Sequence, residues 1–299
     1  MDWEYLIPFL FAHYKYQDFK QRNAALKSVK YAFFERRFSH ILKRYQPPNI
    51  GAGVNKGPIW VCWLQGEEQM PCTIKRCYER LKTMAPAGRE VILLEWRNLD
   101  NYVKLPDYII EKVKRGTINY THFSDILRFS LLAEHGGLWV DSSLYVNSPI
   151  PESVFEQDYF SIYTDFDFNY VGVNRCLWKC FLLGARSHST WFSCARDIIY
   201  EYWKSLNLLI DYLVVDYILL LIYDSNHEVK KAVDSAVEFA PHVLHFEKIA
   251  NEPCVEETYR KMCGECRWFK LSYKLPFKEY TDDGALTYFG RLMSDPNSD

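Results

Sequence analysis

The stretch THFSDILRFSLLAEHGGLWVDSSLYV, residues 121–146, decides the fold of this chain. Its first part, Thr121–Glu134, has the apolar spacing of a helix, and the pair Gly136-Gly137 then lets the backbone turn tightly into a short strand. That strand delivers Asp141 at its carboxyl end. Ligands of open α/β sheets bind outside the carboxyl ends of the strands, so we expect Asp141 to face a ligand.

Strands and helices alternate on the amino-terminal side of this stretch. Apolar runs predict strands at Pro58–Leu64 and Glu90–Trp96, and amphipathic runs predict helices at Pro71–Met84 and Pro106–Arg115. Strands separated by helices indicate a mostly parallel central sheet with both faces covered. We therefore predict an α/β domain over 58–299.

A different kind of segment precedes this domain. Residues 1–46 are helix-compatible and carry nine basic against four acidic residues, a net charge of +5, together with twelve aromatic residues. A Pro/Gly-rich linker, 46–57, follows. We predict a helical N-terminal extension, with two open interpretations: an anchor on an anionic membrane surface, or an appendage packed on the main domain.

Composition excludes several classes of protein. Hydrophobic residues make up 48% and charged residues 25%, which excludes a disordered chain. The net charge of −2 excludes the electrostatic footprint of a nucleic-acid partner. The stretch Leu208–Tyr223 contains two aspartates and predicts a buried helix instead of a membrane span.

The cysteines and the charges of the first residues indicate the cellular compartment. Nine cysteines without the spacing of a disulfide scaffold indicate reduced thiols. Acidic Asp2 and Glu4 precede the apolar run 5–12, where a signal peptide needs positive charge. We expect a cytoplasmic protein, peripheral on the inner face of the cell membrane. The run Cys263-Gly264-Glu265-Cys266 leaves zinc or thiol chemistry open, with Cys176 and Cys180 as the only second half.

Three polar positions within residues 121–146 suit phosphate and sugar chemistry. Asp125 and Arg128 stand three apart on a helix and are neighbours on one face, either as a simple pair or as ligand-binding groups. Asp141 is followed by the hydroxyls of Ser142 and Ser143, and such oxygens can hold a hard divalent cation that bridges phosphates.

The same residues carry a family resemblance. One sequence pattern resembles the donor site of family 32 glycosyltransferases, in particular their capsular polysaccharide synthesis branch. The pattern is SDILR, followed by Gly-Gly and then by an aromatic residue, an apolar residue and Asp. IWVCWLQGEEQMP at 59–71, DYLVVDY at 211–217 and WFKLSYK at 268–274 are similar to further motifs of that branch. The resemblance covers about residues 56–275. It implies a GT-A-like nucleotide-sugar-binding fold and retaining glycosyl transfer.

The resemblance also implies roles for single residues. Asp125 and Arg128 would bind hydroxyls of the donor sugar, and Trp63 would stack the uracil with Gln65 and Gly66 near the ribose. Gly137 belongs to the same donor-binding set. Asp141 and Ser143 would hold Mn²⁺ or Mg²⁺. Many relatives have Asp-x-Asp where this chain has Asp-Ser-Ser, so the resemblance implies a metal that is bound weakly.

The charges that develop during transfer point to further candidates. Negative charge on the leaving phosphate needs cations to stabilise it. Lys270 and Lys274 are candidates for these cations, and they share a face if their stretch is a strand. The alternative is that both are solvated surface lysines. Positive charge on the anomeric carbon needs a carboxylate, Asp125 or Asp216. On one helix Asp211 and Asp216 would lie about 140° apart, so we select Asp216, which has the more apolar surroundings.

Together these inferences predict an enzyme that moves a hexose or N-acetylhexosamine from a UDP-sugar to a hydroxyl of a lipid-linked glycan during capsular or surface polysaccharide biosynthesis. The alternative is a non-catalytic, membrane-attached subunit that retains the fold. Ser143, in place of a second acid, is the reason for that alternative.

Overall fold

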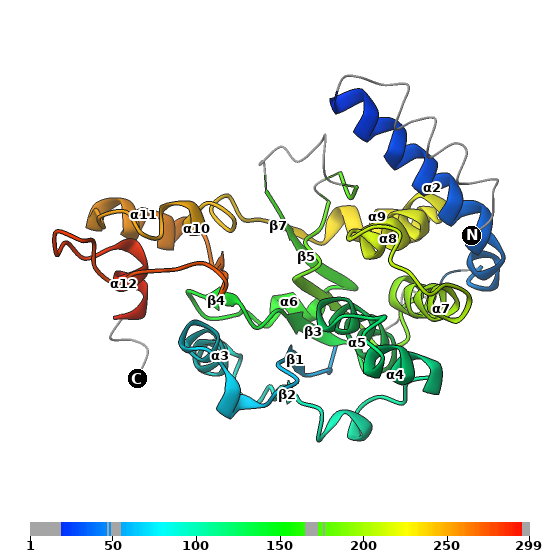
Figure 1. Cartoon of the computed structure of the whole chain (residues 1–299), viewed down its shortest axis with the longest axis horizontal. Coiled ribbons are helices and arrows are strands. Elements are labelled where there is room, and N and C mark those ends of the chain that lie inside the picture. The colour runs from blue at the N-terminus through cyan, green and yellow to red at the C-terminus, as the bar shows by residue number, and fades with distance from the viewer. Residues whose placement is uncertain (1–18, 47, 49–54, 165–172, 176, 295–299) are drawn as a thin grey trace.

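A six-stranded sheet lies at the centre of the computed structural model, which describes residues 19–46, 48, 55–164, 173–175 and 177–294 (Figure 1). The strand order is β2-β1-β3-β6-β5-β7. The strands are β1 (Ile59–Cys62), β2 (Val91–Leu94), β3 (Gly137–Val140), β5 (Tyr159–Tyr163), β6 (Leu182–Ala185) and β7 (Val237–Phe239). A two-stranded sheet joins β4 (Leu144–Val146) to β8 (Trp268–Lys270).

The directions of the strands determine at which edge of the sheet their carboxyl ends meet. Strand β1 runs parallel to β2 and β3, β7 runs parallel to β5, and β6 is antiparallel to both β3 and β5. The sheet is thus mostly parallel, which confirms the predicted α/β class. The carboxyl ends of β1, β2 and β3 meet at one edge of the sheet.

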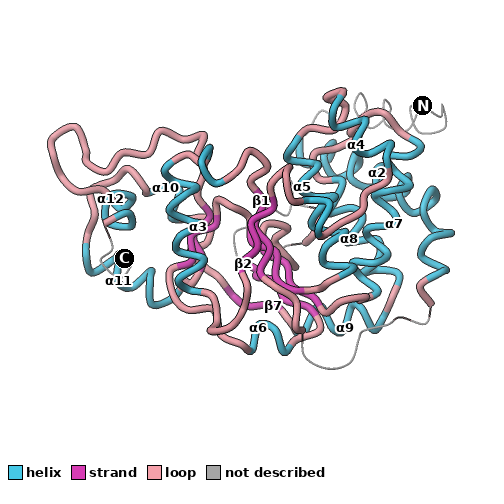
Figure 2. Tube along the Cα trace, turned by 90° about the horizontal axis from the view of Figure 1, so that it is seen from below, coloured by secondary structure: helices cyan, strands magenta, loops and turns pink. Residues whose placement is uncertain are grey.

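Helices cover both faces of the sheet (Figure 2). One side has α2 (Phe19–Arg44), α4 (Asp107–Lys114), α5 (Tyr120–Glu134), α7 (Thr190–Ser205), α8 (Val214–Ser225) and α9 (His227–Ser235). The other side has α3 (Cys72–Met84), α10 (Phe246–Ile249), α11 (Glu256–Glu265) and α12 (Tyr288–Met293). The short helix α6 (Ser153–Glu156) and two 3₁₀ turns, Glu67–Gln69 and Leu99–Asn101, complete the described elements.

Side-chain alternation along the strands divides the hydrophobic core in two. In β1, Ile59 and Val61 pack with α3, while Trp60 faces the cluster formed by α5, α7 and α8. Trp139 of β3 lies in the same cluster as Trp60. Strands buried on both faces read as continuous apolar runs, which is why the sequence predicts them well.

The turn from α5 into β3 depends on glycine. Gly136 and Gly137 have φ values of 67° and 99°, a region that residues with a Cβ rarely adopt. A Cβ on Gly137 would lie 2.1 Å from the carbonyl oxygen of Pro58. The helix end, the turn and the short strand are therefore all as predicted, and they direct the chain toward Asp141.

The N-terminal helix α2 packs on the domain through its aromatic face. The ring of Phe34 lies parallel to those of Tyr202 and Tyr217, at centroid distances of 6.0 and 5.5 Å. Phe33 and Phe38 are buried beside it. For residues 19–44 this is the arrangement that the packed-appendage interpretation predicts. Residues 1–18 lie outside the described part, and the membrane anchor stays a prediction.

None of the helices in the described part of the chain is both long and apolar enough to serve as a membrane span.

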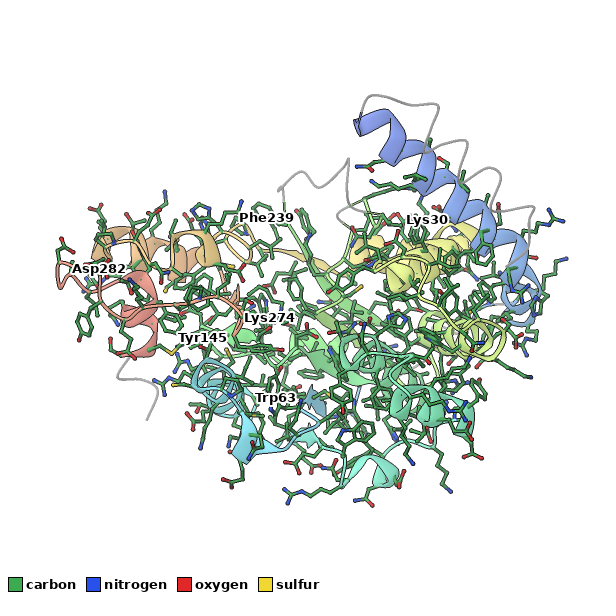
Figure 3. The ribbon with its side chains drawn as sticks, viewed as in Figure 1. Lys30, Trp63, Tyr145, Phe239, Lys274 and Asp282 are labelled. Carbon is green, nitrogen blue, oxygen red and sulfur yellow. The ribbon has the colours of Figure 1, made fainter. Side chains whose placement is uncertain are left out.

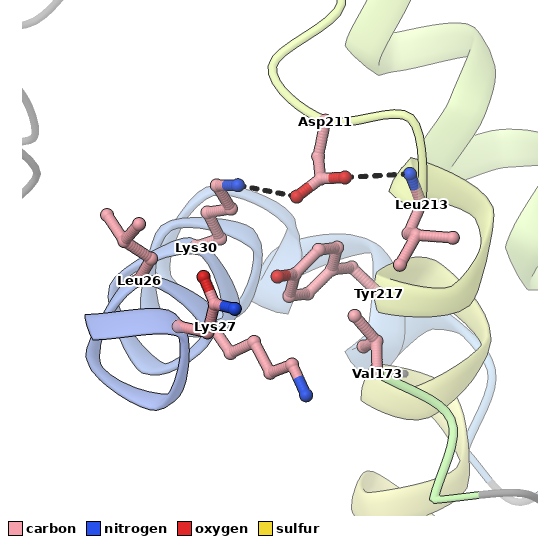
Figure 4. Close-up of a pocket in the computed structure, with 8 residues that line it drawn as sticks. Leu26, Lys27, Lys30, Val173, Asp211, Leu213 and Tyr217 are labelled. Carbon is pink, nitrogen blue, oxygen red and sulfur yellow. Dashed lines mark hydrogen bonds and ion pairs between the residues drawn. The ribbon is translucent and has the colours of Figure 1, made fainter. Parts of the chain in front are cut away.

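A pocket of about 180 Å³ lies between α2 and the start of α8 (Figure 4). Lys30 pairs there with Asp211 at 2.5 Å, and the other oxygen of Asp211 accepts from the backbone N–H of Leu213 at 2.9 Å. Helix α8 begins at Val214, so Asp211 precedes it. The 140° argument, which placed both aspartates on one helix, was therefore wrong, although the two residues do face different surroundings.

Candidate active site

A buried arginine links two carboxylates at the carboxyl edge of the sheet. Arg128 donates from Nη1 to Asp125 Oδ1 at 2.5 Å and from Nη2 to Asp141 Oδ1 at 2.9 Å. Its guanidinium lies 4.9 Å from the ring centre of Trp139. Helix α5 supplies Asp125 and Arg128 one turn apart, and β3 supplies Asp141. The two residues of the helix are thus joined to the strand end, as their positions in residues 121–146 suggest.

A lysine from a distant part of the chain completes this group. Strand β8 pairs with β4 so that Lys270 stands opposite Leu144. The Lys270 ammonium lies 3.5 Å from Asp141 Oδ2 and donates to Ser143 Oγ. We call Asp125, Arg128, Asp141 and Lys270 the charged cluster. Its four side chains come from two elements of the fold, α5 and β8, and from the turn after β3.

Electrostatics keeps the centre of the charged cluster ionised. Burial alone would raise the pKa of Asp141, but the charges of Lys270 and Arg128 and the hydrogen bonds from Trp139 and Arg128 hold that pKa below its usual 3.8. Burial alone would lower the pKa of Arg128, and the two carboxylates outweigh it and raise the pKa. Asp141 therefore stabilises the fold above pH 3.8, a contribution lost as the pH falls through its lower folded pKa.

His122, three residues before Asp125 in α5, contacts the Asp125 carboxylate. His122 is buried in the first turn of α5, with its Nδ1 3.3 Å from Asp125 Oδ2 and its ring edge-on to Trp203. Asn119 caps this helix by accepting from the backbone N–H of His122 at 2.8 Å. His122 is thus placed to orient Asp125.

Asp216 of α8 lies next to the charged cluster in a buried position. Its Oδ1 accepts from Trp178 Nε1 at 2.9 Å, from Asn174 Nδ2 at 3.0 Å and from Cys180 Sγ at 3.3 Å. Burial raises the pKa of Asp216, the three hydrogen bonds oppose that shift, and the charge of Asp125 raises it further. Asp216 is close enough to Asp125 for their charges to interact, and its contacts join α8 to Asn174, Trp178 and Cys180.

Tyr212 is a site residue that the sequence reasoning missed. Its side chain is 71% exposed, yet partial burial and then the charges of Asp125 and Asp141 raise its pKa. In the stretch DYLVVDY the two acids suggest chemistry, and no local pattern distinguishes Tyr212 from Tyr217, which is a buried core residue. An exposed ring beside two carboxylates suits the apolar face of a sugar.

Aromatic and basic residues gather at the end of β1. Trp63 directly follows this strand, is half-buried, and meets Tyr273 edge-on at 5.4 Å. The ammonium of Lys274 lies 5.8 Å from the centre of the same Tyr273 ring. Figure 3 shows Trp63 and Lys274 near the middle of the molecule, with Asp282 at its left end and Lys30 in its upper right part. Strand β8 ends at Lys270, so the stretch 268–274 is not one strand and the condition for both lysines to share a strand face is not met.

A buried glutamate shapes the loop after Trp63. Glu95, at the end of β2, accepts from the backbone N–H of Glu67 at 3.0 Å and pairs with Arg97. Gly66 has a φ of 95°, and a Cβ there would lie 3.2 Å from Glu95 Oε1. The loop that carries Gln65 and Gly66 is thereby fixed at the same edge of the sheet as Asp141. Nothing in the sequence pattern singles out Glu95.

Gly137 lies at the opposite end of β3 from Asp141. Its backbone N–H donates to Asn55 Oδ1 at 2.9 Å, and its carbonyl accepts from Asn55 Nδ2 at 3.1 Å. Close contact with the backbone of Pro58 explains the glycine. The structure gives this residue a packing role and does not bring it together with the charged cluster.

The side chains predicted to hold a metal are already bonded to cations. Asp141 contacts Arg128 and Lys270, and Ser143 contacts Lys270. A dication about 4 Å from the ammonium would be repelled by about 8 kcal/mol at an effective dielectric constant of about 20. Among the described residues, no group of three His, Cys, Asp or Glu side chains can hold a metal ion. As arranged, these residues do not fit a divalent cation, and the metal stays a prediction.

The zinc alternative gains no support from geometry. Cys266 donates to the carbonyl of Trp268 at 3.0 Å, and burial raises its pKa, which disfavours the thiolate that a metal needs. Cys176, required for the second half of a site, lies outside the described residues.

A family model described as "Capsular polysaccharide synthesis protein" matches residues 11–292. The match extends beyond the predicted 56–275 and includes α2 and all of α12 except its last residue. No curated protein matches the chain.

Two solved structures match this chain with TM-scores below 0.5. The apo structure of the WbbM bifunctional glycosyltransferase has 10% identity and a TM-score of 0.43, with 80% of this chain and 50% of that chain covered. The PaToxG glycosyltransferase has 11% identity and a TM-score of 0.38, with 71% and 83% covered. This chain therefore spans half the length of the first structure.

Proposed function

This chain belongs to the capsular polysaccharide synthesis protein family, and on that premise we propose that it is a glycosyltransferase acting in the assembly of such polysaccharides. It takes a hexose or N-acetylhexosamine from a UDP-sugar and transfers it to a hydroxyl of a lipid-linked glycan. The observation that carries the proposal is the charged cluster, because it gathers two cations and two carboxylates at the edge where an α/β sheet binds ligands.

The nucleotide would lie along the ends of β1 and β2. Trp63 offers the uracil a ring face, and the edge-on contact with Tyr273 supports that ring from the side. The loop fixed by Glu95 carries Gln65 and Gly66, which would lie beside the ribose. The diphosphate then reaches Lys270, whose side chain is 22% exposed and open to a ligand.

The sugar would lie between the charged cluster and Tyr212. Asp125, 13% exposed, accepts from sugar hydroxyls, and Arg128 holds its carboxylate in place. Tyr212 covers the apolar face of the sugar ring. Asp216, buried and bonded to Trp178, Asn174 and Cys180, adds negative charge near Asp125.

The transfer itself breaks the bond between the anomeric carbon and the diphosphate, and the electron pair stays on the phosphate oxygen. A new bond forms from the acceptor hydroxyl oxygen to the same carbon. In a retaining transfer the leaving phosphate oxygen takes the acceptor proton, so a separate general base is not needed. Lys270 and Arg128 stabilise the charge on the leaving group, and Asp125 stabilises the positive charge on the anomeric carbon.

Release of UDP is the direct test of this function. The full chain is incubated with a panel of UDP-sugars, with Mn²⁺ in one series and a chelator in the other. We expect one or two donors to give slow UDP release by hydrolysis, and an added lipid-linked acceptor to accelerate it. Nucleotide binding with no release for any donor, with and without acceptor, would favour the non-catalytic subunit, and no binding of any nucleotide would contradict the proposal.

Replacing Trp63 by alanine is expected to weaken UDP binding by about 1–3 kcal/mol, the usual contribution of one base–aromatic stack. Titration calorimetry on folded protein measures it. Trp96→Ala is the matched control, because this 39% exposed tryptophan already has one face stacked on Phe123 at 5.2 Å. If the Trp96 variant loses affinity while the Trp63 variant does not, the base stacks at the end of β2 instead.

A further inference from the structure

The ammonium group of Lys270 contacts the two side chains that the family resemblance assigns to a metal ion. It contacts both side chains expected to be metal ligands, the Asp141 carboxylate at 3.5 Å and the Ser143 hydroxyl. The remaining carboxylate oxygen of Asp141 accepts from Arg128 and Trp139, each at 2.9 Å. The Asp141 oxygens and the Ser143 hydroxyl therefore already have partners in the protein: hydrogen bonds at Asp141 Oδ1 and Ser143 Oγ, and an ion pair with Lys270 at Asp141 Oδ2.

The backbone holds Lys270 at this place. Its N–H donates to the carbonyl of Val243 at 2.8 Å, and the following residue, Leu271, donates to the carbonyl of Ser143 at 2.9 Å. The ammonium also lies 5.5 Å from the ring centre of Phe181. The strand that carries Lys270 is thus bonded on one side to the Asp-Ser-Ser turn itself, so the position of the lysine follows from the sheet pairing.

The substitution at Ser143 makes chemical sense in this arrangement. A second carboxylate here would add negative charge that a dication balances, whereas a neutral hydroxyl accepts one hydrogen bond from an ammonium. With serine, the carboxylates of Asp125 and Asp141 are balanced by Arg128 and Lys270, without an added metal.

We propose that Lys270, held between Asp141 and Ser143, supplies the positive charge that binds the donor diphosphate, so that the enzyme needs no divalent cation. This proposal rests on the proposed function. Lys270 contacts the diphosphate directly, and Arg128 adds its charge from its buried position between Asp125 and Asp141. When the bond to the sugar breaks, the electron pair left on the phosphate oxygen is stabilised by these two fixed cations.

The test measures nucleotide affinity and UDP release on the full chain in the presence of EDTA and then of Mn²⁺. We expect both quantities to change by less than about twofold between the two conditions. Lys270→Ala is expected to lower UDP affinity about 10- to 100-fold, the range for losing one hydrogen bond between charged groups. Lys278→Ala, which removes a surface lysine paired with Asp282 at 2.7 Å, is the matched control and should leave affinity unchanged.

EDTA that abolishes UDP binding and release, with recovery on Mn²⁺ addition, would overturn the metal-free proposal while leaving the glycosyltransferase function intact. The wild-type comparison decides this even if the Lys270 variant fails to fold. A protein that binds no nucleotide and releases no UDP in either condition would instead contradict the proposed function.

Discussion

Replacing Arg128 by leucine is expected to cost the protein both its stability and its activity. The side chain is nearly fully buried between the carboxylates of Asp125 and Asp141, and removing it leaves two negative charges without their shared partner. Breaking a buried ion pair by removing one partner costs about 3–5 kcal/mol. Urea denaturation of the folded variant measures this loss.

Arg128→Lys separates the two effects. Lysine keeps the charge, but one ammonium cannot reproduce the two separate donations of the guanidinium fork. We expect a smaller loss of stability and still a fall in turnover of about 10²–10³-fold, the usual result of losing a preorganised donor. Arg291→Lys is the control, since Arg291 pairs with Glu256 outside the charged cluster. Full activity of Arg128→Lys would show that the charge alone suffices.

Asp141→Asn is expected to reduce turnover by about 10²–10³-fold while the protein stays folded. The substitution keeps the shape of the side chain and removes the charge that orders Arg128 and Lys270. Asp141 stands at a strand end with 28% of its side chain exposed, so no core packing is lost. Steady-state UDP release, with circular dichroism to check folding, measures the effect.

Ser143→Ala is the matched comparison for Asp141→Asn. It removes only the hydroxyl that accepts from Lys270, and the ammonium keeps its ion pair with Asp141. We expect a loss of a few fold at most, because water can replace a neutral hydroxyl. If Ser143→Ala proves as damaging as Asp141→Asn, the hydroxyl has a role that the charge balance does not explain. Unchanged activity of Asp141→Asn would remove this residue from the site.

The local sequence was sufficient for the elements that carry Asp125, Arg128 and Asp141. Helix α5, the glycine turn and β3 are contiguous, and their signals are apolar spacing and backbone freedom, which act over a few residues. The position of Asp141 at a strand end followed directly. For the same reason β1 and β2 were placed within three residues of their observed bounds.

The contacts of Lys270 were beyond such reasoning. They arise from the antiparallel pairing of β4 with β8, which joins segments more than a hundred residues apart and leaves no local pattern. The sequence supplied the lysine as a candidate, and it placed Lys274 on the same face only if 268–274 formed a strand, but the strand ends at Lys270. Tyr212 and Glu95 were missed because an exposed ring and a buried carboxylate acquire meaning only from neighbours in space.

The structure of the full chain bound to UDP would test the central claim most directly. The account predicts uracil against Trp63 and the diphosphate within hydrogen-bonding distance of Lys270, at the edge formed by the ends of β1, β2 and β3. A nucleotide bound elsewhere, for example in the pocket between α2 and α8 beside Lys30, with the charged cluster untouched, would contradict it.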